Sequence, residues 1–461
     1  MAGLSDQKME IVRRLVEQAG DTIVGNLSSA LASSQSDSLL GGVQTMVEAE
    51  LADRRLRDAV FSPVASVFVG GAQSAERLTF PRRALGLIWR ALKCEAKADV
   101  AAAATEVSDF KPHESSARSC DLLMTRAAEG LRQPERPEFA EAVAILNAAR
   151  PNALSQLLIC LDIAPVVREA CLCLSDWTLR SNDAHVAAAR ISYSDAVAIH
   201  DEAGPCYYEM LAAKLPHPWM VLRIISAAMD RPPEGYVAGS EVDFFPLRYL
   251  DQIDANLKRV DEFNPGNGLE AGAEMGQVVE LITRQISEVE TTIELSREGP
   301  WGLRVQKQKK ALAQVVENRL WGLEKAIAIL LPNHMVRVGK ANRSVPKLDH
   351  TIDAAGKDCC VCLISFAESV RTSANYGGFA SARAKMLEKV GENLDDYVQE
   401  VLSQIRDDRS LNLELADKHL ACAADLVTLI RDERAGDVVR RRAATALSVA
   451  NATDSDLSRA S

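Results

Sequence analysis

Aromatic residues are scarce in this chain, and their scarcity is the first guide to its fold class. Phe, Trp and Tyr together make up 5% of the 461 residues, whereas Ala, Leu, Glu and Arg are abundant. Strands favour aromatic and β-branched residues, while helices favour Ala, Leu, Glu and Arg. The composition therefore predicts an all-α protein.

A dominant positive charge is also missing, because the formal net charge at pH 7 is −11. Nucleic acid and anionic membranes attract proteins with a dominant positive field. No apolar run approaches the roughly 20 residues that a membrane-spanning helix needs, and residues 1–20 lack the apolar core of a signal peptide. We therefore expect no nucleic-acid partner and no transmembrane segment.

Cysteine is present, but the ten copies are too diluted in a chain of this length to indicate a disulfide scaffold. Several lie in apolar contexts, such as LLICLDIA around Cys160. Free cysteine behaves as a small apolar residue and is often buried. This usage predicts core thiols in a reducing, cytoplasmic setting.

The densest thiol cluster consists of Cys359, Cys360 and Cys362. Zinc ligation needs two separated pairs of ligands that surround the ion, and no second Cys or His pair follows at finger-like spacing. His334 and His350 lie upstream and could complete a site. The apolar residues that follow the cluster favour a buried helix, so we expect no metal here.

No catalytic motif stands out along the chain. Glu-x-x-His, His-Glu-x-x-His, the Gly-x-Ser-x-Gly elbow and the phosphate-binding Gly-rich loop are all missing. Asp395, Asp396 and Glu400 could place three carboxylates on nearby helical turns, as in magnesium-dependent isoprenoid enzymes, but no facing acidic motif accompanies them. The sequence thus indicates no catalytic, cofactor-binding or metal-ligating residues.

Proline and glycine divide the chain into two parts. Proline recurs up to Pro346 and then stops, which predicts long unbroken helices in the C-terminal quarter. The turn-forming stretch NPGNG, Asn264–Gly268, opposes both helix and strand and predicts a linker. We expect an N-terminal multi-helix region (1–263), this linker (264–268), a long-helix antiparallel bundle (269–450) and a disordered tail (451–461).

One segment favours an extended conformation. Phe61–Gly71 reads FSPVASVFVGG, in which β-branched and aromatic residues are flanked by a proline and a glycine pair. Such a pattern is typical of a strand. We expect it to be a single extended segment within the helical region.

Two segments after the linker predict a helical hairpin. The charged residues of Glu270–Glu298 are mostly acidic and those of Arg304–Lys325 are mostly basic, so the two segments should attract each other, and the Gly299–Gly302 turn lies between them. Apolar residues in both recur at alternating steps of four and three, which is the pattern of a coiled-coil seam. The seam residues are Met275, Val279, Ile282, Ile286, Val289 and Ile293, then Ala313, Val316, Leu320, Leu323, Ile327 and Leu330.

Phe80–Lys93 reads FPRRALGLIWRALK and predicts an amphipathic helix. Leu85, Ile88, Trp89 and Leu92 share one arc, which favours a core-facing side. A membrane or nucleic-acid surface and a partner-binding helix are the alternatives. The candidate partner-binding face consists of Arg82, Arg83, Trp89, Arg90 and Lys93.

These patterns favour a non-enzymatic helical interaction or regulatory scaffold that binds other proteins. Self-association through the long helices is also expected. The alternative is a helical-bundle enzyme whose site is assembled between helices from residues distant in sequence.

Overall fold

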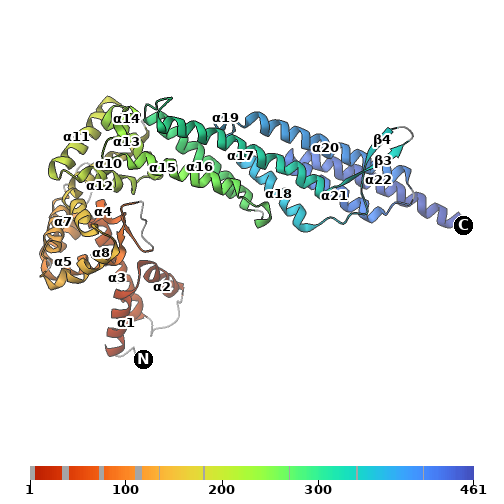
Figure 1. The fold of residues 1–461 in the computed structure, drawn as a ribbon. Helices are drawn as coiled ribbons and strands as arrows, with labels where there is room; N and C mark the ends of the chain where they lie inside the picture. The colour runs from red at the N-terminus through yellow and green to blue at the C-terminus, as the bar shows by residue number, and fades with distance from the viewer. Residues whose placement is uncertain are drawn as a thin grey trace. The chain divides into compact units, whose positions relative to one another are not determined.

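The fold was analysed in a computed structural model, which describes residues 6–33, 41–71, 77–108, 117–133, 135–179, 182–268, 270–338, 341–408 and 410–460. Within these residues, helices form nearly all of the regular structure, and the only sheets are two two-stranded ones (Figure 1). The prediction of an all-α protein is confirmed.

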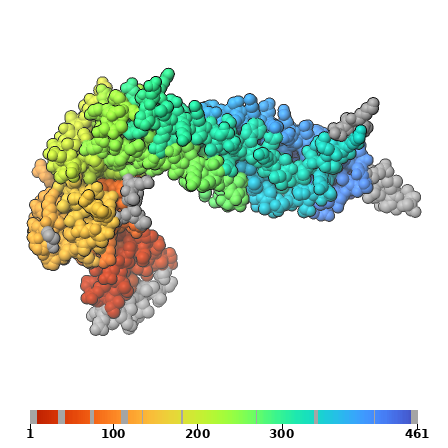
Figure 2. Space-filling model, in the orientation of Figure 1, coloured from red at the N-terminus to blue at the C-terminus, as the bar shows by residue number. Residues whose placement is uncertain are grey.

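The chain folds into two compact units. The first consists of Met1–Phe245 with Thr292–Glu294, and the second of Pro246–Thr291 with Leu295–Ser461. Each unit buries a set of apolar side chains between its helices, and Figure 2 shows the atoms of one face of the molecule in the same orientation as Figure 1.

The first unit begins with three helices that share a small apolar core. These are α1 (Asp6–Gln18), α2 (Asp21–Ser33) and α3 (Gly41–Val60). Val16, Val24, Val43 and Val47 are buried together, and half-buried side chains from all three helices pack against them. The C-terminal half of α3 leaves this cluster and contacts α6 and α7, so it connects the N-terminal helices to the rest of the unit.

The rest of the first unit consists of short helices. Their bounds are α4 (Ser62–Ala65), α5 (Arg82–Glu95), α6 (Lys97–Ser108), α7 (Arg118–Leu131), α8 (Pro137–Ala149), α9 (Ala153–Asp162), α10 (Ala164–Leu179), α11 (Asp183–Ile199), α12 (Ala203–Ala212), α13 (Val221–Met229) and α14 (Glu234–Val237), with the 3-10 turn η1 (Pro218–Met220). Prolines occupy the first turn of α4 and α8, where a missing N–H costs no helical hydrogen bond.

The predicted extended segment Phe61–Gly71 is mostly wrong. Its first half forms α4, and only β1 (Phe68–Val69) is a strand, which pairs in parallel with β2 (Phe80–Pro81). Val64 and Val67 are fully buried. Because strand preference chiefly reflects how well a side chain packs on its neighbours, burial in a helical core overrides it here.

The second unit contains the longest helices. Their bounds are α15 (Phe244–Asp261, beginning in the first unit), α16 (Glu270–Thr292), α17 (Pro300–Leu330), α18 (Ala354–Ser369), α19 (Ala374–Gly377), α20 (Ala380–Asp407), α21 (Leu413–Ile430) and α22 (Glu433–Ala460), with the 3-10 turn η2 (Pro265–Asn267). The prediction of long helices after Pro346 is confirmed. Side chains cap the starts of several of them: Asp353 accepts hydrogen bonds from the first N–H groups of α18, Asn412 from those of α21 and Asp432 from the Ala435 N–H of α22.

The two predicted seams face inward, as expected for the hairpin. Along α16 and α17 the seam residues are buried, apart from Met275 and Ala313, which are half-buried. Lys309 Nζ of α17 lies 3.1 Å from Glu290 Oε1 of α16, which places the two helices side by side. The chain reverses between them at Gly299–Pro300, so they run antiparallel (Figure 1).

Another close approach joins α16 to α18. A Cβ atom at Gly272 would lie 2.0 Å from the carbonyl oxygen of Cys362, and one at Gly276 would lie 2.3 Å from Cβ of Ser369. Both positions therefore need glycine, because no side chain fits between the two backbones.

A β-hairpin in the second unit was not predicted. β3 (Asn333–Val338) pairs antiparallel with β4 (Ala341–Pro346), with Met335 opposite Ser344. β4 packs on α20. The segment alternates Val336 and Val338 with Arg337, which is a strand signal that its many polar residues weaken.

The predicted linker, 264–268, lies inside the second unit, where it forms η2 and connects α15 to α16. Asn264 accepts a hydrogen bond from Gly266 N, which is the turn chemistry that the sequence indicated. The division between the units falls at Phe245, in the first turn of α15. The predicted tail, 451–461, coincides with the end of α22, and Ser461 lies outside the described residues.

Candidate functional site

The apolar arc of α5 faces the core. Leu85, Ile88, Trp89 and Leu92 are buried, and Trp89 is only 2% exposed. The Trp89 indole N–H donates a hydrogen bond to Asp53 Oδ2 at 3.1 Å, which satisfies its only polar atom. The prediction of a core-facing arc is confirmed, and Trp89 is not on the surface where a partner could contact it.

Two of the basic residues predicted on this face are held by carboxylates. Arg82 Nε donates to Asp21 Oδ2 at 2.8 Å and its Nη2 pairs with Asp58. Lys93 Nζ lies 2.7 Å from Asp53 Oδ2. These side chains therefore serve the packing of α5 against the N-terminal helices.

The remaining two, Arg83 and Arg90, are exposed. Arg83 pairs with Glu141, but the two side chains are 73% and 53% exposed, so water screens the pair. Among the described residues, Arg90 makes no hydrogen bond or ion pair. The predicted face thus divides into Arg82, Trp89 and Lys93, which bond to carboxylates of the first unit, and an exposed arginine pair.

A partly buried charged network centred on Asp21 lies in the same cavity as this pair. Arg54 Nη1 and Arg57 Nη2 donate to the two Asp21 oxygens at 2.7 and 2.9 Å. The Arg54 and Arg57 side chains are 9% and 5% exposed. Sequence reasoning did not find Asp21, because it is far from Arg54 and Arg82 along the chain.

Arg54 also caps a helix. Its Nη2 donates to the carbonyl oxygens of Val16 and Ala19, both at 3.0 Å. The last carbonyls of a helix have no intrahelical partner and carry partial negative charge, so a guanidinium satisfies both needs. The network therefore fixes the end of α1 to α3 and to α5.

Electrostatics within the network favour the charged forms. Burial alone would raise the pKa of the Asp21 carboxyl, but hydrogen bonds and charges from Arg82 and Arg57 outweigh it, so the pKa is lowered. Burial would likewise lower the pKa of Arg57, yet Asp58 and Asp21 raise it.

These residues line an open cavity of about 850 Å³, which we call the arginine groove. It runs between the α1–α2 junction, α3, the end of β1, and α5. Its charged and larger apolar side chains are Arg54, Arg57, Arg82, Arg83, Arg90, Glu17, Asp21, Glu141, Phe68, Val69 and Leu87. Arginines outnumber carboxylates on its walls, in a chain whose net charge is negative.

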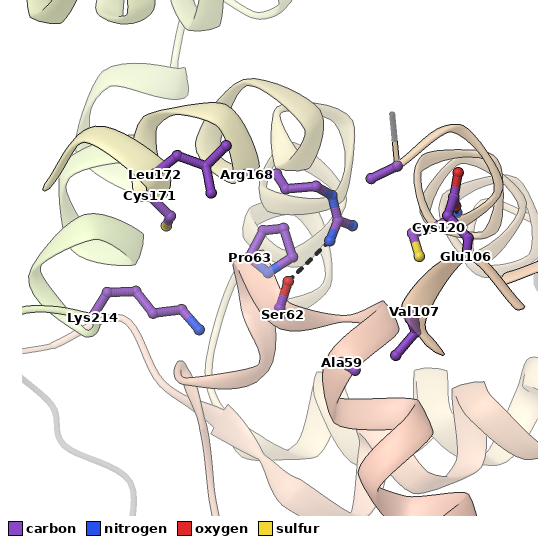
Figure 3. Close-up of a pocket in the computed structure, with 11 residues that line it drawn as sticks. Ala59, Ser62, Pro63, Glu106, Val107, Cys120, Arg168, Cys171, Leu172 and Lys214 are labelled. Atoms are coloured by element: carbon purple, nitrogen blue, oxygen red, sulfur yellow. Dashed lines mark hydrogen bonds between the residues drawn. The ribbon is translucent and has the colours of Figure 1, made fainter. Parts of the chain in front are cut away.

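A second cavity in the first unit, of about 310 Å³, is the Lys214 pocket (Figure 3). Its lining comes from segments distant in sequence, and for that reason sequence reasoning did not find it. The residues are Ala59, Ser62, Pro63, Glu106, Val107, Ala117, Cys120, Arg168, Cys171, Leu172 and Lys214.

The other sequence candidates lie in the second unit, where Cys359 is half-buried and His334 and Asp396 are exposed. Cys360 and Cys362 are buried on α18, and burial raises the pKa of Cys360 to about 12. Asp395 pairs with Arg431 at 2.7 Å and Glu400 with Arg343 at 2.6 Å. In the part of the chain that the structure describes, no three His, Cys, Asp or Glu side chains are grouped so as to hold a metal ion.

A buried histidine, His419, has a hydrogen-bond partner at each ring nitrogen and also lies in the second unit. His419 Nε2 lies 2.8 Å from the carbonyl oxygen of His350, and its Nδ1 lies 2.7 Å from the Tyr397 hydroxyl. A carbonyl oxygen only accepts, so Nε2 carries the proton and Tyr397 donates to Nδ1. Burial lowers the pKa of His419, which agrees with a neutral ring.

Among the described helices, none combines the length and the apolar character needed to cross a bilayer. Comparison of the chain with models of protein families, with curated proteins and with solved structures finds no match.

Proposed function

We propose that this protein is a non-enzymatic helical scaffold that binds an acidic, partly apolar segment of a protein partner in the arginine groove. The observation that carries the proposal is the exposed pair Arg83 and Arg90 at the edge of a groove whose inner arginines are already held by carboxylates.

Charge supports this choice of partner. The inner arginines, Arg54, Arg57 and Arg82, are balanced by Glu50, Asp21 and Asp58. Arg83 is paired only through its exposed contact with Glu141, and Arg90 has no ion pair among the described residues, so Arg90 adds positive charge at the edge of this balanced network. Because the chain as a whole is acidic, an acidic segment would be repelled elsewhere and directed to this groove.

Side-chain chemistry supports a protein segment. Guanidinium groups bind carboxylates through two parallel hydrogen bonds and are favoured at interfaces. Val69 and Leu87 are half-buried on the groove walls and offer apolar contacts beside these charges. An amphipathic acidic segment would use both, whereas a nucleic acid would need a broader positive field than a chain of net charge −11 provides.

The proposal includes a cytoplasmic location and self-association. All ten cysteines are free, which supports a reducing compartment. The long helices α21 and α22 expose Leu429, Val438 and Val449, and these offer an apolar surface to a second copy. Sedimentation velocity over a range of concentrations tests self-association, and a constant monomer value contradicts that part.

Binding is tested by fluorescence anisotropy with a short labelled peptide rich in Glu and Leu. We expect saturable binding that weakens with added salt, and about a tenfold loss of affinity, or roughly 1.4 kcal/mol, in the Arg83→Glu/Arg90→Glu variant. Both side chains are exposed, so the variant should fold.

The matched control is Arg55→Glu/Arg118→Glu, which changes the net charge equally at two exposed arginines of the first unit outside the groove. Its affinity should equal that of the parent. Equal weakening in both variants would show a non-specific charge effect, and no binding by the parent would refute the proposal.

A further inference from the structure

The Lys214 pocket is independent of the arginine groove, and its walls are mostly apolar. Ala59, Pro63, Val107, Ala117 and Leu172 supply hydrocarbon surface. Its volume of about 310 Å³ lies at the lower end of the range for small-molecule sites.

The two thiols of the pocket are uncharged. Burial raises the pKa of Cys120 to about 11 and also raises that of Cys171. Neutral thiols behave as small apolar groups, and they are poor nucleophiles because the thiolate is the reactive form. The pocket therefore suits the apolar body of a ligand rather than thiol chemistry.

Arg168, one of three charged side chains in the pocket, is fully engaged. Its Nε donates to Asp121 Oδ1 at 3.0 Å, its Nη1 to Ser62 Oγ at 2.9 Å and its Nη2 to the Val60 carbonyl oxygen at 3.0 Å (Figure 3 shows the Ser62 bond). Its charge is thus balanced by Asp121, and its position ties α10 to α7 and to the end of α3.

Glu106 is also occupied, because its carboxylate accepts a hydrogen bond from Cys120 N at 3.0 Å. This bond satisfies one of the free N–H groups at the start of α7. Arg168 is therefore balanced by a carboxylate, and one oxygen of Glu106 is held by the backbone of α7.

Lys214 differs from both. It follows the end of α12 and directs its ammonium into the pocket, toward Ser62 and Pro63 (Figure 3). Among the described residues it has no hydrogen bond or ion pair. The carboxylate that acts on it electrostatically, Asp58, already pairs with Arg57 and Arg82.

An ammonium in this position lacks a counter-charge. Lys214 is exposed as a residue, yet the atoms that surround its ammonium in the pocket lower its pKa, and the neighbouring Arg168 lowers it further. An anion placed against the ammonium would supply the missing counter-charge, and an apolar body attached to that anion would fill the space beside it.

We infer that the Lys214 pocket binds a small monocarboxylate with an apolar body, with the carboxylate on the Lys214 ammonium and the body against Leu172, Val107 and Pro63. The charge specifies an anion, and the limited volume together with the apolar walls specifies a short hydrocarbon or aromatic chain.

The test uses the full chain and three probes with the same body: octanoate, octanol and octylamine, each titrated calorimetrically. We expect octanoate to bind with one site per chain. Octanol should bind about tenfold more weakly because it lacks the ion pair, and octylamine should not bind. Equal affinity for octanoate and octanol, or preference for octylamine, would overturn the inference.

Two variants locate the site. Lys214→Gln removes the charge and should weaken octanoate about tenfold, whereas Lys214→Arg should stay close to the parent. Leu172→Glu adds a carboxylate at a wall position that is 37% exposed, so the fold should persist while octanoate binding is lost. Unchanged binding in Lys214→Gln contradicts the site.

A labelling measurement gives an independent readout. Octanoate should slow acetylation of Lys214, measured by mass spectrometry, and should leave the exposed Lys307 and Lys310 of α17 unaffected. Equal acetylation of Lys214 with and without octanoate, at concentrations that saturate the calorimetric signal, would also contradict the inference.

Discussion

The first and second units pack helices in different ways. Short helices in the first unit are joined through a charged network in which Arg54 and Arg57 are almost fully buried. In the second unit, α16 and α17 present long apolar seams that include Val279, Ile286 and Leu320. A buried charge is stable only when its charged partner lies at a fixed position, whereas a buried apolar seam accepts many combinations of apolar side chains of similar volume.

This difference gives the two units different roles: the first positions charged groups, and the second provides stability. Charged contacts in the first unit place Arg83 and Arg90 at the edge of a groove and leave Lys214 facing a pocket. The seams of the second unit supply stability that does not depend on any particular charge. Four substitutions test the difference, ordered from the largest expected effect to the smallest.

Ile286→Asp should break the second unit. Ile286 is fully buried on α16, and an aspartate there would place an unpaired charge in an apolar seam. We expect a loss of about 5 kcal/mol in the free energy of unfolding of this unit. Hydrogen exchange read by mass spectrometry should show faster exchange in α16 and α17.

Gln277→Asp is the control for that variant. Gln277 is exposed on the same helix, so the same new charge should cost little there. If the two variants unfold at the same denaturant concentration, the prediction that Ile286 lies in a buried apolar seam is wrong.

Trp89→Ala should break the first unit instead. The indole is buried, packs edge-on against Phe61 with ring centroids 6.3 Å apart, and donates to Asp53. The cavity and the lost bond should cost about 4 kcal/mol. Faster exchange should be confined to α3, α5 and neighbouring helices, and equal destabilisation in the second unit would show that the units do not unfold separately.

Asp21→Asn should sharpen the comparison, because it removes the shared carboxylate but keeps the shape. Two nearly buried arginines would lose a partner while Glu50 and Asp58 remain. Since the Asp21 side chain is 35% exposed, solvent should reduce the cost to about 2 kcal/mol.

The pH dependence of the same variant has a definite sign. The folded-state pKa of Asp21 is lowered, so below about pH 4 the unfolded chain binds the proton more readily. Its contribution to stability is present above that pH and is lost as the pH falls through the folded-state pKa. The first unit of Asp21→Asn should therefore lose less stability in acid than the parent, and identical acid profiles would contradict the role of Asp21.

Tyr397→Phe should have the smallest effect. It removes the hydroxyl that donates to His419 Nδ1 and leaves that buried nitrogen without a donor. The expected cost is about 1 kcal/mol, detected as a small shift in the denaturation midpoint of the second unit. A loss as large as that of Ile286→Asp would mean that polar contacts, rather than seams, hold this unit.

The parts of the fold with a regular sequence period could be predicted. Steps of three and four residues identified Val279, Ile282 and Leu320 as buried, because a helix repeats its faces at that spacing. The same reasoning correctly predicted that Trp89 is buried.

Features that depend on distant contacts could not be predicted. Asp21 joins Arg82 across 61 positions of the chain, and the Lys214 pocket collects residues from separate helices. Within the basic cluster before Ala313, Lys309 pairs with Glu290 of α16 as the opposite charges indicated, whereas Arg304 pairs with Asp251 and Asp254 of α15. Periodicity shows which face of a helix is buried but not which helix covers it.

Hydrogen exchange of the full chain with and without the acidic peptide tests the central claim most directly, because it shows where the peptide binds. We predict slower exchange in the segments that line the arginine groove, 17–22 and 81–90, no change in α20–α22, and loss of the protection in Arg83→Glu/Arg90→Glu. Protection in the second unit with none in the groove at saturating peptide would contradict the account.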